Sequence, residues 1–303
     1  MLFKNIRFYC STKPLAFDAQ TLEERLAQHA FTEGESFSRT RMGWVSPLGA
    51  DGQTLTHALG DYIMICARKD EKLLPASVIN DELAKKVEEI EEKQGRKVFR
   101  KEKLQLKDDV TAALLPRAFT RTRLIFAYFD LRNNLLIVNS SSATVADEIT
   151  AALRESLDTL PVTLPVAEHS PNDVMTRWLE SQQASDGFVI NQDCELFNPL
   201  EDSNVVRCKG QDLYSDEIKA HLEAGKQVKK LGLLWNDTLN CVVSADLVVS
   251  QIKFEDVILD EAGEAEDAAA QFDQDFAIMT GEFSKFLRAL FSAFGGVGSL
   301  KKD

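Results

Sequence analysis

The sequence predicts an α+β fold with two related α/β layers, mainly antiparallel sheets, and a helical arm inserted in the first half. Three observations support this class. Short apolar strand-like runs alternate with amphipathic helical stretches, the same order of elements recurs in both halves, and one long stretch of the first half has helical periodicity only. The 303 residues, 44% hydrophobic and 27% charged, suffice for about two domains and exclude disordered or collagen-like chains.

Strand and helix signals follow one another closely at the beginning of the chain. Strands are expected at residues 2–9 and 62–67, where apolar residues alternate or run almost without interruption. A helix is expected at 21–30, with a T-x-x-E capping box that begins at Thr21. Residues 42–49 contain a tryptophan, a proline and two glycines, and are expected to form a turn-rich loop.

The periodicity is helical from about residue 78 to residue 114. Apolar residues recur every three or four positions, which places them on one face of a helix: Ile79, Leu83, Val87 and Ile90. Gly95 is expected to break this helix, and a second helical stretch follows until Pro116. We interpret residues 77–118 as a helical arm inserted into the first domain.

The first domain resumes after the arm. Strands are expected at 124–129 and 135–138 with a hairpin turn between them, and a helix at 145–157. Residues 159–165 contain two prolines and are expected to link to a second unit. The predicted division is a central α+β domain at 1–76 and 119–160, the arm at 77–118, and a second α+β domain at 161–303.

The second domain begins with Ser170 and Pro171, a helix N-cap followed by a first-turn proline. Ser215 is expected to cap a short helix that ends at Gly225. A long helix is expected at 267–294, with phenylalanines along one face. The expected strands are 187–190, 205–208, 231–235, 241–249 and 250–254. The shared order of the halves fits an internal duplication or a coincidence of two α+β layers, and both remain open.

The cysteines and histidines lack the patterns of disulfide frameworks and metal sites. Five cysteines are widely spaced without a C-x-x-C motif, so we interpret them as buried reduced thiols, with a reactive thiol as the alternative. The four histidines lie in no zinc motif, and no metal is expected. Signal-peptide and membrane-spanning runs are absent, so a cytoplasmic protein without membrane contact is expected.

Charge is strongly segregated along the chain. The whole sequence has a net charge of −13, yet residues 93–123 contain ten basic and three acidic residues. Such a basic strip suits a phosphate backbone, while the acidic remainder opposes general collapse onto polyanions. Three interpretations stay open from composition: nucleic-acid binding, a surface for a protein partner, and a solvated helix face.

Two apolar features and a second basic group have several interpretations. The phenylalanines of the long helix favour core packing, with a subunit interface as the alternative. Phe119, between Arg117 and Arg121, fits a core residue, an intercalating wedge or an interface plug. A weaker basic group flanks the short helix of the second domain: Arg207, Lys209, Lys226, Lys229 and Lys230.

No catalytic pattern is present in the sequence. The motifs G-x-S-x-G, a Gly-rich phosphate loop, and G-x-G-x-x-G after a strand are all missing. Asp108 and Asp109 are neighbours on a predicted helix and diverge by about 100°, so they do not form a two-carboxylate site. We therefore expect neither an enzyme nor a cofactor.

Seven segments follow one another along nearly the whole chain: MLFKNIRFY, MGWVSPLG, ICARKDEKLLPASVI, LLPRAFTR, VVRCKGQDLYSDEI, HLEAGK and FDQDFAIMTGE. In this collinear order they resemble the RdgC family of bacterial recombination-associated proteins, whose members have about the length of this chain. Seven matches in order over this length make a coincidence improbable.

The resemblance implies a ring-shaped homodimer, closed head to head by two contacts per subunit, with duplex DNA passing through a basic hole. It further implies DNA binding with little sequence preference, restraint of the RecA recombinase, a role in replication-fork repair, association with the nucleoid, and no catalytic activity. The implied partners are double-stranded DNA, single-stranded DNA more weakly, a second copy of the chain, and RecA as a functional antagonist.

Site residues are expected in the matching segments and the basic strip. Arg117 and Phe119 lie in LPRAF, which in the family helps to close the ring, and the RCKGQDL segment lies near a subunit contact and the hole. In that segment Gly210 stands where relatives can have a second lysine, a departure that weakens this expected contact. The expected DNA-binding residues are Lys93, Arg96, Lys97, Arg100, Lys101, Lys107, Arg117, Lys209, Gln211, Lys226, Lys229 and Lys230. The expected dimer-interface residues are Arg117, Phe119, Leu213, Phe283 and Phe286.

Two other functions stay open beside the one that the resemblance implies. One is a protein-interaction scaffold that acts directly on the recombinase, and the other is a DNA nuclease. Inhibition of the recombinase that persists with DNA sites in large excess would favour the scaffold. The missing carboxylate pattern argues against the nuclease.

Overall fold

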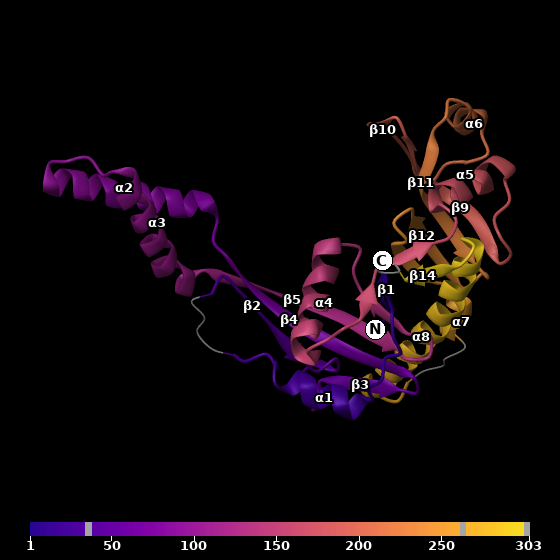
Figure 1. Ribbon diagram of the computed structural model, residues 1–303, viewed down its shortest axis with the longest axis horizontal. Helices are drawn as coiled ribbons and strands as arrows, with labels where there is room; N and C mark the ends of the chain where they lie inside the picture. Colours follow the sequence, from indigo (N-terminus) through magenta and orange to yellow (C-terminus); the bar gives the residue numbers. More distant parts are fainter. Residues whose placement is uncertain (34–37, 261–264, 300–303) are drawn as a thin grey trace.

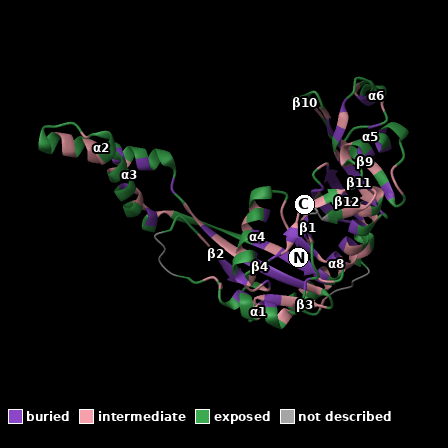
Figure 2. Ribbon diagram, viewed as in Figure 1, coloured by how far each residue is buried: buried purple, intermediate pink, exposed green. Residues whose placement is uncertain are grey.

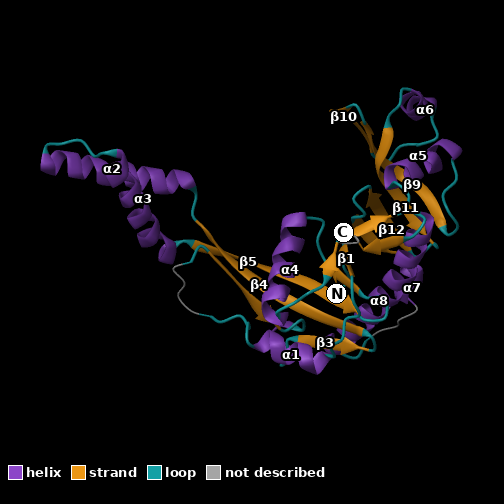
Figure 3. Cartoon of the chain, viewed as in Figure 1, coloured by secondary structure: helices purple, strands orange, loops and turns teal. Residues whose placement is uncertain are grey.

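The computed structural model confirms the α+β class with mainly antiparallel sheets. It describes residues 1–33, 38–260 and 265–299. The described chain is bowed, with a central sheet in the middle, a helical arm at one end and a second sheet with its helices at the other (Figure 1). The arm and the second sheet rise on the same side of the central sheet, and one helix, α4, stands between them (Figure 3).

The central sheet has seven strands, and every pair in it is antiparallel. The order is β2-β4-β5-β6-β1-β7, with β3 paired to β4. β4 and β5 pair along their whole lengths, so that together they extend beyond the sheet as a ribbon. The bounds are β1 Arg7–Ser11, β2 Thr40–Val45, β3 Thr56–Leu59, β4 Tyr62–Leu73, β5 Phe119–Asp130, β6 Leu135–Val138 and β7 Val162–Thr163.

Two sequence expectations are wrong in this sheet. Part of the loop expected at 42–49 is strand β2, because pairing with β4 buries Trp44, whose indole Nε1 donates to Ser156 Oγ at 2.8 Å. The first strand begins later than residue 2, because Ile6 forms a bridge with Val249 of the second sheet. The N-terminal residues therefore connect the two sheets.

Helices α1 (Ala19–Ala27) and α4 (Ala143–Leu157) cover one face of the central sheet and share an apolar cluster with it. The expected helix at 145–157 is thus confirmed. The capping box expected at Thr21 is wrong, since α1 begins earlier, with Asp18 as its N-cap. The Asp18 carboxylate accepts a hydrogen bond from Thr21 N at 2.8 Å, which is the usual role of an N-cap side chain.

The arm is a pair of helices at the end of the β4–β5 ribbon, which confirms the two expected helices, while the bounds of the arm at 77–118 stay a prediction. α2 spans Ala76–Gln94, α3 spans Arg100–Leu114, and a 3₁₀ turn, η2, follows at Leu115–Arg117. Gly95 ends α2 with a φ of 62°, a left-handed conformation that glycine adopts at little cost. A small apolar cluster packs the base of the arm, made of Leu74, Ile79, Val110 and Leu115. The rest of the arm is mostly exposed (Figure 2).

The second sheet has the order β10-β9-β11-β12-β13 and is antiparallel. The strand expected at 241–249 is confirmed only as far as Ser244, because the chain turns at Leu247, where φ is 58°. The strands are β8 Pro165–Ala167, β9 Phe188–Asn198, β10 Glu201–Cys208, β11 Gln227–Trp235, β12 Leu239–Ser244, β13 Val249–Phe254 and β14 Val297–Ser299. The helices are α5 Pro171–Ser181, α6 Asp216–Glu223, α7 Asp256–Asp260 and α8 Ala268–Ala293. β8 and β14 form a separate pair.

One large apolar core joins the two sheets around α8. The central sheet contributes Met64 and Tyr128 from the face opposite α1 and α4, and the second domain contributes Trp178, whose ring stacks on Phe294 with centroids 5.9 Å apart. Because this core is shared, the two halves are packed together rather than joined by a free linker. The division at residues 160 and 161 stays a prediction, as does the internal duplication.

Two phenylalanines expected at a subunit interface lie inside this core. Phe283 and Phe286 of α8 are both fully buried within the chain. The Phe286 ring meets Trp235 edge to face at a centroid distance of 5.7 Å. The interface expectation for both residues is therefore wrong, because neighbours of the same chain already enclose their side chains.

Candidate nucleic-acid interface

The arm presents a row of basic side chains to solvent. The row comprises Lys93, Lys97, Arg100, Lys101 and Lys107, all exposed. Within the described residues none of them forms an ion pair. Long cationic side chains without an internal counterion remain available to bind phosphate oxygens.

Arg96 differs from the other arm residues because it has structural partners. Its two terminal nitrogens each donate to a carboxylate oxygen of Glu102 at 2.8 Å, and Nε donates to Gln94 Oε1 at 2.8 Å. The hydrogen bond from Arg96 holds the pKa of Glu102 below its usual range, so the carboxylate stays ionised. Arg96 therefore fixes the turn between α2 and α3, and its DNA-binding role stays a prediction.

Further basic residues, beyond those expected to bind DNA, lie on the ribbon. Lys69 is opposite Arg123 and Glu71 opposite Arg121, so all four side chains share the face that α4 covers. Together with Glu148 and the first turn of α4, they line a cavity of about 260 Å³. The basic residues at 117–123 indicated Arg121 and Arg123 as candidates in the sequence. Only the strand register shows that their side chains lie on the same face as Lys69.

Two of these ribbon cations are partly neutralised and one is not. Arg121 binds Glu71 at 2.6 Å, and this hydrogen bond holds the pKa of Glu71 below its usual range. Lys69 forms an ion pair with Glu148. Arg123 is exposed and has no ion pair within the described ranges. Because the N-terminus of a helix also attracts anions, the site keeps a net attraction for a phosphate group.

The loop after β10 holds Lys209 and Gln211 at the surface. Both side chains are exposed. The backbone between them is fixed, because Gly210 N donates to Asp193 Oδ1 at 2.9 Å and Gln211 N donates to Gln192 O at 3.1 Å. The structure thus presents both residues in a defined loop, and their contact with DNA stays a prediction.

Three of the lysines expected to bind DNA lie on β11 or just before it: Lys226, Lys229 and Lys230. One of them is not available for this role. Lys226 is buried, and its Nζ donates to the backbone and side-chain oxygens of Asn204. Its expected role as a DNA contact is therefore wrong. Lys229 is exposed, with its Nζ 5.9 Å from the centroid of the Phe197 ring.

Lys230 is the third of these lysines, and it shares a carboxylate with Arg207. Both donate to Glu195 Oε2 at 3.1 Å. Burial opposes ionisation of Glu195, but these two hydrogen bonds outweigh it and hold the pKa of Glu195 below its usual range. Lys230 is thus partly neutralised before any anion binds.

The remaining residues expected at a subunit contact differ in their exposure to solvent. Phe119 is 85% exposed and lies opposite Leu73, which is 46% exposed, at the last register position of the ribbon. Arg117 beside it is also exposed. Leu213 is buried in the core of the second domain, so its expected role in the interface is wrong.

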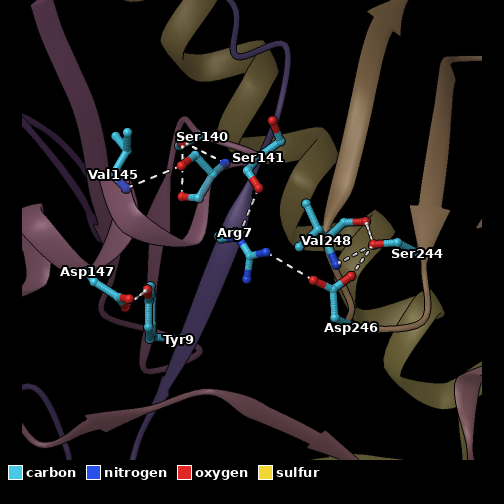
Figure 4. A network of polar contacts seen from close by, with 10 residues as sticks. Arg7, Tyr9, Ser140, Ser141, Val145, Asp147, Ser244, Asp246 and Val248 are labelled. Atoms are coloured by element: carbon cyan, nitrogen blue, oxygen red, sulfur yellow. Dashed lines mark hydrogen bonds and ion pairs between the residues drawn. The ribbon is translucent and has the colours of Figure 1, made fainter. Parts of the chain in front are cut away.

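A polar network fixes α4 and the second domain on either side of β1 (Figure 4). Arg7 on β1 donates through Nε to Ser141 O at 3.1 Å and through Nη2 to Asp246 Oδ2 at 3.0 Å. Ser141 precedes Ser142, the N-cap of α4, and Asp246 lies in the turn after β12. Near this network, burial and the neighbouring Asp147 raise the pKa of Tyr9 to about 12. The network links the segment before α4 to the turn after β12 through Arg7.

Neither a metal cluster nor a membrane span is found in the part of the chain that the structure describes. No three His, Cys, Asp or Glu side chains within the described ranges are grouped to hold a metal ion. No helix in these ranges is both long and apolar enough to cross a bilayer. The candidate interface consists of basic side chains on an exposed arm, on the ribbon and on a fixed loop.

The comparisons with known proteins assign this chain to a family. The sequence model described as "Putative exonuclease, RdgC" matches residues 1–297, so the chain belongs to the RdgC family. Proteins named Recombination-associated protein RdgC are 44% identical over 299 residues in Aeromonas hydrophila and 42% identical over 302 residues in Psychromonas ingrahamii. The alignments cover 98% and 99% of this chain, and 98% and 100% of those relatives. The expected family membership is confirmed.

Proposed function

We propose that the protein binds duplex DNA without sequence preference, as a ring-shaped homodimer that encircles the DNA. The observation that carries this proposal is the unpaired basic row of the arm on a chain with a net charge of −13. Phosphate contacts position a protein on DNA but do not report base identity, so such a row supports binding to any sequence. Family membership supports a role in recombination.

The bowed shape supports encirclement by two copies. One chain presents cations on the arm, on the ribbon and on the loop at Lys209, but leaves the bow open on one side. A second copy related by two-fold symmetry would close it, and two-fold dimers are the commonest protein oligomers.

The cellular role follows from occupation of DNA. A ring on the duplex restrains RecA by denying it DNA, and acts in the nucleoid, including at replication forks under repair. Single-stranded DNA has fewer phosphates per unit length and is bound more weakly. The competing proposal is a scaffold that contacts the recombinase directly, for which inhibition undiminished by excess DNA would be the signature.

A comparison of closed circular with linear DNA tests encirclement. Protein bound to closed circular DNA at low salt should remain bound after a rise in salt, whereas protein on linear DNA of the same sequence should slide off. Cutting the circle with a restriction enzyme should release the retained fraction. Equal loss from circular and linear DNA would overturn encirclement and leave simple surface binding.

The family description also names an exonuclease, which makes a second candidate function. We expect no degradation when the protein is incubated with Mg²⁺ and end-labelled linear DNA, because the sequence lacks a carboxylate pattern for metal-assisted hydrolysis. Release of labelled nucleotides in proportion to protein concentration would establish the nuclease instead.

Phe119→Ser is expected to weaken self-association and leave the subunit folded. The side chain is 85% exposed, so its removal costs the isolated chain little, whereas a phenylalanine buried at an interface is a common hot spot. Sedimentation at several concentrations should give a dimer dissociation constant raised roughly 30-fold or more, equivalent to about 2 kcal/mol. Leu200→Ser, at a leucine that is 95% exposed, is the matched control. An unfolded Phe119→Ser variant, or one with unchanged association, would contradict this role.

A further inference from the structure

Two cysteines lie directly opposite each other on neighbouring strands of the second sheet. Cys194 of β9 is the register partner of Cys208 of β10. Opposed residues of antiparallel strands have Cα atoms about 4.5–5.5 Å apart, and their side chains point to the same face. Disulfides join Cα atoms about 4.4–6.8 Å apart, so this pair lies within bonding range without movement of the strands.

The two thiols line the same cavity, as expected for register partners. Burial first, and then the neighbouring Cys208 thiol, raise the pKa of Cys194. The other three cysteines have no cysteine as a register partner: Cys10 is opposite Leu135 and Thr163, Cys66 is opposite Val45 and Phe126, and Cys241 is opposite Leu233. Cys194 and Cys208 are thus the single opposed pair among the five cysteines, all of which lie in the described ranges.

We propose that Cys194 and Cys208 form a thiol–disulfide site, which a peroxide oxidises within the folded subunit. The peroxide first converts one thiol to a sulfenic acid and leaves as water. The second thiol attacks that sulfur, the S–O bond breaks as the S–S bond forms, and the oxygen leaves as a second water. In total, two thiols lose two protons and two electrons to one hydrogen peroxide, which becomes two waters. A dithiol reductant reverses the step.

The environment of the pair makes this oxidation slow but selective. The side chains are 5% and 7% exposed, and burial raises the pKa of Cys194 to about 12, so little thiolate is present at neutral pH. Access comes from β10, which is the edge strand of its sheet and opens more readily than an inner strand. A cavity of about 180 Å³ is lined by both cysteines together with Arg207 and Lys209. Once one sulfur is oxidised, the opposed thiol is the nearest nucleophile.

Peptide mapping of the full-length protein tests the proposal independently of DNA binding. The folded protein is incubated with hydrogen peroxide, remaining thiols are alkylated, and the protein is digested with trypsin without a reductant. Because trypsin cleaves after Arg207, the bond would join fragment 178–207 to the dipeptide 208–209. The expected result is this linked product as the main disulfide, with Cys10, Cys66 and Cys241 alkylated.

Substitutions identify the partners. Cys208→Ser should abolish the linked product, and Cys241→Ser, at another buried cysteine of the same sheet, should leave it unchanged. If either variant does not fold, the peptide map of the oxidised chain without substitutions decides alone whether the Cys194–Cys208 bond forms. A map with all five cysteines alkylated after prolonged peroxide treatment would overturn the proposal. Sulfinic acid at Cys194 without the link, or a mixture of cysteine pairings, would overturn it as well.

Discussion

Simultaneous substitution of Lys97, Arg100 and Lys101 by glutamate should weaken duplex DNA binding roughly 10–100-fold at moderate salt. All three side chains are exposed and lack an ion pair in the described chain, so each substitution removes a cation that can bind phosphate and adds a repulsive charge. The slope of log K against log salt should also become shallower by about 0.9 for each phosphate that the variant no longer neutralises. Fluorescence anisotropy with a labelled duplex measures both quantities.

The arm should remain folded in this variant. Arg100 and Lys101 occupy the first turn of α3, where acidic side chains interact favourably with the helix dipole. The matched control reverses three exposed basic residues outside the arm, Lys4, Lys13 and Arg177. It changes net charge equally and should alter the salt slope little. If the control variant weakens duplex DNA binding as much as the arm variant does, overall charge governs binding rather than the arm.

Phe286→Ala should lower the free energy of unfolding by about 3–5 kcal/mol. The ring is fully buried against Trp235 and Phe188, with centroids 5.7 and 6.0 Å away, and its removal leaves a cavity in the core that joins the two sheets. This is a large part of the roughly 5–15 kcal/mol that stabilises a typical domain. Urea unfolding followed by tryptophan fluorescence measures the change, because Trp235 reports directly on the site.

Phe99→Ala is the control for this core substitution. Phe99 lies on the arm and is 71% exposed, so its truncation should change the unfolding free energy by no more than about 0.5 kcal/mol. If Phe286→Ala instead leaves stability unchanged and dissociates the dimer, the residue is an interface residue after all, and the packing of α8 within a single chain is wrong.

The sequence predicted those elements whose signals are local. The helical periodicity after Pro75 and the break at Gly95 located the arm, because apolar spacing and a left-handed glycine depend only on nearby residues. The helix at Ala143–Leu157 and the strand at Leu135–Val138 were found for the same reason. The strand β2 was missed, because Trp44 becomes buried only through pairing with β4, which is distant in the sequence.

The candidate site was predictable only in part. Segregated charge indicated the arm, but it did not distinguish an exposed lysine from Lys226, which Asn204 holds in a buried position. Nor did it indicate that Arg96 is paired with Glu102. The sequence alone did not group Arg121 and Arg123 with Lys69, because that grouping depends on the strand register. Charge in a sequence therefore identifies a candidate surface, whereas its individual contacts depend on tertiary structure.

The most direct test of the central claim is binding to two 40-base-pair duplexes of unrelated sequence, measured by anisotropy from low to physiological salt. We predict equal affinities for the two duplexes. If the two arms of a dimer neutralise about 6–8 phosphates, log K should fall against log salt with a slope near −5 to −7. Absence of binding even at low salt, or a strong preference for one duplex with a shallow salt dependence, would contradict a phosphate-binding surface.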